Sequence, residues 1–147
     1  MARALFLTML VLAALAISCK SYTTTLKESP SKVDEGATIS TLRSIYGAQT
    51  AYSVSNDGNY GTFKELVAGG YLDQRFNSSR PVLYGYAFTI STNAKSQDSA
   101  TATYSCNADP QAPAVAKGRH FYINSSSLEM HVNENQPASA NDPIVQP

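Results

Sequence analysis

This sequence has few of the residues that build chemical sites. Tryptophan is absent, there are only two cysteines and two histidines, and the formal charges cancel to zero over 147 residues. No basic run or patch interrupts this balance, so we expect no nucleic-acid partner. No serine stands in a Gly-x-Ser-x-Gly motif, and Gly69-Gly70 fits a helix stop better than a phosphate-binding loop. The sequence therefore predicts a protein that is not an enzyme, without catalytic residues or a cofactor.

The first nineteen residues have the features of an export signal. Arg3 provides a positive charge, residues 4–17 form an uncharged apolar run, and small residues lead to Cys19. The run is shorter than the roughly 20 residues that span a bilayer, which favours a secretory signal over a transmembrane helix. Removing Arg3 with the signal leaves ten Lys and Arg against eleven Asp and Glu, so the mature chain has a net charge of about −1.

The end of this signal resembles the lipobox of bacterial lipoproteins. In that family the cysteine thiol takes a diacylglycerol, the signal is cut before it and the new amino group is acylated. The resemblance implies that residues 1–18 are a signal peptide, that Cys19 is the lipid-attachment residue, and that the protein is anchored in the bacterial cell envelope, at the outer membrane. The family favours Leu three places before the cysteine, whereas this chain has Ala16 there. The alternative is an ordinary cleaved signal that ends in a cysteine by chance.

If Cys19 is acylated, Cys106 has no partner and no intrachain disulfide forms. Cys106 ends a predicted strand and has no basic neighbour in the sequence to lower its pKa, so we expect a buried, inert thiol. After the lipidated cysteine, residues 19–32 are polar and unpatterned, which predicts a flexible tether.

A long helix is predicted to follow the tether. Ser31 can cap it, and two acidic residues favour the positive end of its dipole. Apolar or long side chains then recur three or four positions apart, at Ile39, Leu42, Ile45, Tyr46, Gln49 and Tyr52. Thr38 and Thr41 lie mostly off this stripe. The turn residues Asn56-Asp57-Gly58-Asn59 end the helix.

The rest of the chain predicts a short helix and then a sheet. Thr62 and Glu65 form a capping box, and Gly69-Gly70 ends the short helix. The period then changes to two, which predicts strands near residues 82–90, 100–106, 119–123 and 128–132. Residues 134–147 carry three prolines and no pattern, so we expect a disordered tail. The fold class is α+β, with the long N-terminal helix packed on an antiparallel sheet of about four strands in a domain over residues 33–133.

This order of elements resembles the globular domain of type IV pilins and type II secretion pseudopilins. The resemblance is carried by residues 37–52, then by Gly58-Asn59-Tyr60-Gly61-Thr62, Gly70-Tyr71-Leu72-Asp73, residues 84–89 and residues 119–124. It implies a pilin-like fold. The family, however, begins with a glycine before a cleavage point, followed by Phe and an intramembrane Glu on a spanning helix, and this chain has no such segment.

We therefore expect a membrane-anchored, non-enzymatic envelope lipoprotein whose pilin-like domain presents its sheet or loops to an envelope protein partner. The alternative is a pilin-like component of a type II secretion or type IV pilus system. A small envelope enzyme is a third possibility, which no residue favours.

The two histidines lie in the last two predicted strands. If Asn124 to Ser127 is a four-residue loop, Ile123 pairs with Leu128 and His120 pairs with His131. Two imidazoles beside Glu129 would suit Zn²⁺. The alternative is an exposed polar sheet face with cross-strand pairs. Because a third firm ligand is missing, we predict no metal. The opposite, core-facing set would be Phe121, Ile123, Leu128, Met130 and Val132.

Overall fold

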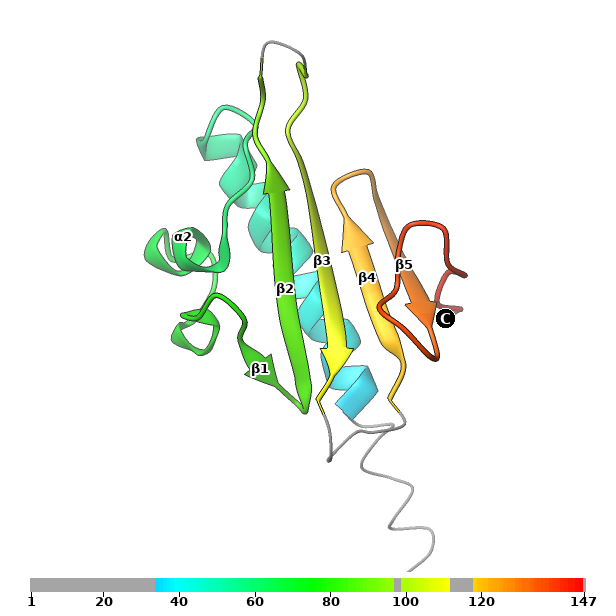
Figure 1. The fold of residues 1–147 in the computed structure, drawn as a ribbon. Coiled ribbons are helices and arrows are strands. Elements are labelled where there is room, and N and C mark those ends of the chain that lie inside the picture. The colour runs from blue at the N-terminus through cyan, green and yellow to red at the C-terminus, as the bar shows by residue number, and fades with distance from the viewer. Residues whose placement is uncertain (1–33, 97–98, 112–117, 147) are drawn as a thin grey trace, which may run out of the picture. The chain divides into compact units, whose positions relative to one another are not determined.

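The computed structural model describes residues 34–96, 99–111 and 118–146, and these form an α+β fold. Residues 34–55 are helical and lie along one face of a five-stranded antiparallel sheet (Figure 1). The strands are β1 (Val82–Leu83), β2 (Tyr86–Asn93), β3 (Thr103–Pro110), β4 (His120–Asn124) and β5 (Ser127–Asn133). They lie side by side in chain order. The predicted α+β class with an antiparallel sheet is thereby confirmed, while the predicted cap Ser31 lies outside the described residues.

The helix over residues 34–55 buries a wider face than its apolar stripe predicts. Leu42 and Ile45 are fully buried, as expected. Thr38 and Thr41, which we predicted to lie mostly off the stripe, are also buried. Each threonine hydroxyl donates to the main-chain carbonyl four residues earlier, at 2.7 and 2.8 Å. Because the helix itself satisfies these hydroxyls, threonine can face the core as a small apolar residue would.

The core fills the space between this helix and the sheet. Its buried members come from the helix, from α2 and η1, and from the inward-facing positions of β2 to β5. They are Leu42, Ile45, Phe63, Val67, Phe76, Tyr86, Phe88, Tyr104, Cys106, Ala108, Phe121, Ile123 and Met130. Aromatic rings contact one another within it, with the Phe63 and Phe76 rings 5.8 Å apart. Each aromatic side chain buries more apolar area than most other side chains do.

The short helix α2 (Phe63–Ala68) begins and ends as its sequence predicts. Thr62 is the N-cap, and its main-chain N–H donates to the Glu65 carboxylate at 2.8 Å, which completes the capping box. Gly70 has a φ of +75°, the left-handed conformation that commonly terminates a helix. The 3-10 helix η1 (Gln74–Phe76), which we did not predict, follows at once.

The segment predicted as one strand over residues 82–90 is two strands. Tyr84 and Gly85 both have positive φ, +54° and +77°, which defines a type I′ turn between β1 and β2. The alternation of large and small residues continues through the turn, so the sequence pattern gives no sign of it. The prediction of about four strands is corrected to five for this reason.

The pairing of β4 with β5 also differs from the prediction. Asn124 pairs with Ser127 across a two-residue turn, while Tyr122 pairs with His131. The ladder is irregular between these pairs, where Ile123 alone lies opposite three residues of β5. Such a bulge re-aims side chains. Leu128, predicted to be in the core, is consequently 69% exposed.

Residues 134–146, predicted to be disordered, are ordered, and we call them the C-terminal strap. The strap runs back along the edge of β5 (Figure 1), where the Val132 amide donates to the Pro143 carbonyl at 2.8 Å. The Val145 amide donates in turn to the Met130 carbonyl at 2.7 Å. These bonds join main-chain groups, which every sequence carries, so a segment without hydrophobic period can still pair with a strand edge.

Candidate functional site

The predicted lipid-attachment residue lies outside the part of the chain that the structure describes. Cys19 belongs to residues 1–33, so its modification stays a prediction. Among the described residues, no helix is both long and apolar enough to cross a membrane. The candidate sites described below therefore lie on the domain over residues 34–146.

The two histidines are not paired with each other, so that prediction is wrong. His120 lies opposite Asn133, and its Nδ1 is 2.7 Å from the Asp109 carboxylate. His131 is buried, and its Nδ1 lies 2.7 Å from the main-chain carbonyl of Asp142 in the strap. The Nδ1 atom of each imidazole thus contacts a different residue. Within residues 34–96, 99–111 and 118–146, no three side chains of His, Cys, Asp or Glu gather to suit a metal ion.

Cys106 is fully buried in the core, as the sequence predicts. Burial raises the pKa of its thiol, and the negative charge of Asp109 raises it further. A thiol that resists ionisation is a poor nucleophile and a poor metal ligand. Cys106 therefore contributes to the packing of the hydrophobic core.

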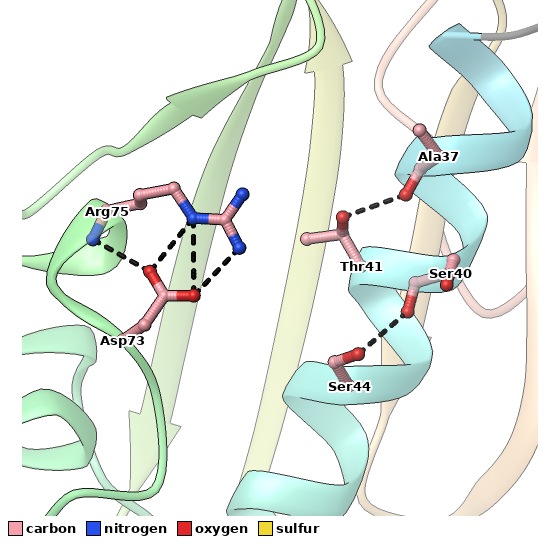
Figure 2. Close-up of polar contacts among 6 residues, drawn as sticks. All are labelled: Ala37, Ser40, Thr41, Ser44, Asp73 and Arg75. Carbon is pink, nitrogen blue, oxygen red and sulfur yellow. Dashed lines mark hydrogen bonds and ion pairs between the residues drawn. The ribbon is translucent and has the colours of Figure 1, made fainter.

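A small cleft of about 240 Å³ separates the helix over residues 34–55 from the segment around η1. Figure 2 shows its polar groups. Arg75 donates from Nε and Nη2 to both carboxylate oxygens of Asp73, at 3.0 and 2.8 Å. This pairing lowers the pKa of Asp73 and raises that of Arg75. The hydroxyls of Thr41 and Ser44 on the facing helix donate to main-chain carbonyls. The polar groups drawn here already have partners, so the cleft offers little for a ligand to bind.

A larger groove of about 570 Å³ lies between α2, the loop at residues 77–79 and β2. Its lining side chains are Thr62, Phe63, Lys64, Asn77, Ser78, Ser79 and Ile90. Phe63 is buried and Ile90 half-buried, while Lys64 is exposed. We call it the α2–β2 groove. It combines apolar side chains with a cation at its margin, which suits an apolar group next to an acidic one.

The short length of β1 explains where this groove lies. β1 pairs with β2 only at Ala87 and Tyr86, and the Phe88 amide donates to the Pro81 carbonyl. Beyond Phe88, no described strand pairs with β2 on that side. Sequence reasoning missed the groove because its residues come from three separate segments. No local pattern in the sequence signals it.

The comparisons with known proteins add no relative. No protein-family model matches the chain, and no match was found among curated proteins or solved structures.

Proposed function

We propose that this chain is a membrane-anchored, non-enzymatic lipoprotein of the bacterial cell envelope, held at the outer membrane, whose domain is a protein-interaction or structural module. One observation carries the proposal: Cys19 directly follows an uncharged apolar run and small residues. Lipid on this cysteine would make the membrane the first partner of the chain. The exposed surfaces of the folded domain would then be available to an envelope protein.

The proposal includes a pilin-like fold for the domain, with a long N-terminal helix on the sheet. The chain order supports it: residues 34–55 are helical, a short helix follows, and an antiparallel meander completes the domain. This order is shared by many α+β domains, so it supports the likeness without deciding the activity.

The same order favours a second candidate, a pilin-like component of a type II secretion or type IV pilus system. The two candidates differ at the start of the mature chain. An acylated Cys19 marks a lipoprotein, whereas a free, unlipidated amino terminus elsewhere would favour the second candidate. Intact-mass analysis of the membrane fraction separates them.

The decisive variant is Cys19→Ala, because alanine cannot take a thioether-linked lipid. We expect it to move the protein to the soluble fraction or to block removal of residues 1–18. Ser21→Ala, two positions away, is the matched control and should leave fractionation and mass unchanged apart from the substitution. A Cys19→Ala protein that stays membrane-bound with a normally processed terminus would overturn the lipoprotein proposal.

A further inference from the structure

The described domain carries opposite charge at its two sheet edges. Residues 63–95, which include α2, β1 and β2, hold four of its six Lys and Arg and only two Asp or Glu. Residues 119–146, which include β4, β5 and the strap, hold three acids and one arginine. That arginine, Arg119, is paired with Glu35 at 2.8 Å. Because β1–β2 and β5 are at opposite edges of the sheet, the domain has a basic edge and an acidic edge (Figure 1).

The acidic edge exposes an apolar side chain beside a carboxylate. The bulge in β5 leaves Leu128 69% exposed, and the adjoining Glu129 is exposed as well. The Glu129 carboxylate has only a hydroxyl contact, with Ser127 at 3.3 Å, among the described residues. A large apolar side chain turned outward by a bulge has no role in the core of its own domain, and bulges of this kind are common at functional edges.

The α2–β2 groove on the basic edge has the complementary chemistry. The half-buried Ile90 supplies apolar surface, and Lys64 lines the groove without an acidic partner in the described part of the chain. The neighbouring Glu65 carboxylate is occupied by the amide and hydroxyl of Thr62. An apolar side chain next to a carboxylate is therefore the group that this groove would accept.

We propose that the occupant of the α2–β2 groove is the Leu128–Glu129 edge of a second copy of this chain. Leu128 of one copy lies on Ile90 of the next, and the Glu129 carboxylate faces the Lys64 ammonium. The two surfaces are at opposite edges of one molecule, so the contact is heterologous and copies join head to tail. The inference goes beyond the proposed function and stands on the described domain alone, so the loss of the lipid anchor would leave it intact.

The first test asks whether the contact exists between chains. Purified full-length protein labelled with ¹⁵N is mixed with unlabelled protein in mild detergent, and a carbodiimide is added to join amines to carboxylates in contact. We expect a Lys64–Glu129 cross-link that joins one labelled and one unlabelled peptide, as mass spectrometry detects directly. Absence of this mixed peptide, or its formation within single chains only, would overturn the inference.

The second test exchanges the charges. Sedimentation velocity of the full chain should show concentration-dependent association that Lys64→Glu and Glu129→Lys each weaken at least about tenfold, since like charges face each other in both variants. Mixing the two variants restores one native contact and creates one exchanged contact, so association should return. Leu128→Ser should weaken association, whereas Arg43→Glu, which changes an exposed helix residue outside the groove lining, should not.

Three outcomes of the second test count against the proposal. A full chain that stays monomeric at every concentration would show that the groove is not filled by a second copy. Single variants that associate as well as the natural sequence would place any contact elsewhere. A mixture that remains as weak as either variant alone would show that Lys64 and Glu129 do not face each other.

Discussion

At the scale of single residues, Gln49 links the helix to the segment before α2. It is fully buried, donates from Nε2 to the Gly61 carbonyl at 2.6 Å and accepts from the Gly61 amide at 3.0 Å. Two buried main-chain groups thus depend on one side chain. The periodicity placed Gln49 on the inward face but did not indicate this role, because its partner is twelve residues away.

Replacing Gln49 with Ala should leave both Gly61 groups buried without partners. We expect a loss of about 3 kcal/mol in the free energy of unfolding, since each unpaired buried group costs about 1–3 kcal/mol. Chemical denaturation of the purified protein measures this. The neighbouring Thr50→Ala changes an exposed residue and should cost no more than about 0.5 kcal/mol. Similar small losses for both variants would contradict the buried linkage.

At the scale of elements, the helix over residues 34–55 is held by aliphatic and threonine side chains together. Leu42→Ala should cost about 2–5 kcal/mol, because Leu42 is fully buried in the core. Thr41→Ala should cost about 1 kcal/mol through lost packing and its hydroxyl bond, although the stripe alone predicts a surface-like value. Equilibrium unfolding of both variants measures these changes in the free energy of unfolding. If Thr41→Ala caused no measurable loss, the buried face of the helix would be limited to the predicted apolar stripe.

The C-terminal strap is an element that depends on the ionised state of one carboxylate. Asp142 accepts from Asn133 Nδ2 at 2.7 Å and from the Ser139 amide at 2.7 Å. These bonds, with the Ser139 hydroxyl, hold the pKa of Asp142 below its usual range. The stabilisation they give is fully present above the unfolded pKa and is lost as pH falls through the lowered folded pKa.

We therefore expect Asp142→Asn to loosen the strap at neutral pH. The amides of Val145 and Val132 should lose protection against hydrogen exchange, while the Leu66 amide in α2 keeps its own. The natural sequence should show the same selective loss when the pH drops below the lowered pKa of Asp142. Glu134→Gln, an exposed change in the same strap, is the control. Equal protection of Val145 in both variants would contradict the assigned role of Asp142.

At the scale of the whole molecule, the core residues that the structure describes run from Leu42 to Met130, all within residues 34–146. A chain of this length buries enough surface to fold by itself. A protein that begins at Ser31 should accordingly be soluble and unfold in one cooperative transition, as monitored by circular dichroism and near-ultraviolet absorbance. Loss of cooperativity, or an aggregated product, would show that residues before Ser31 are required for the domain to fold.

The local sequence determined the parts of this protein that depend on neighbours in the chain. The capping box at Thr62 and Glu65, the stop at Gly69-Gly70, and the inward positions Leu42 and Ile45 all follow from spacing and residue type. Cys106 was likewise predicted to be buried, because it ends a predicted strand and has no basic neighbour in the sequence. These features use contacts within one turn of helix or one face of a strand, which a periodic pattern records directly.

Only the tertiary structure decided the features that join distant segments. The type I′ turn at Tyr84-Gly85 divides one apparent strand, and the bulge in β5 turns Leu128 outward and separates His120 from His131. The strap pairs with β5 through main-chain groups, and the α2–β2 groove arises where β1 ends early. Main-chain groups can pair whatever the side chains are, and a bulge or a tight turn shifts the register by residues that a period-two pattern does not distinguish. These features are settled only when the strands meet in space.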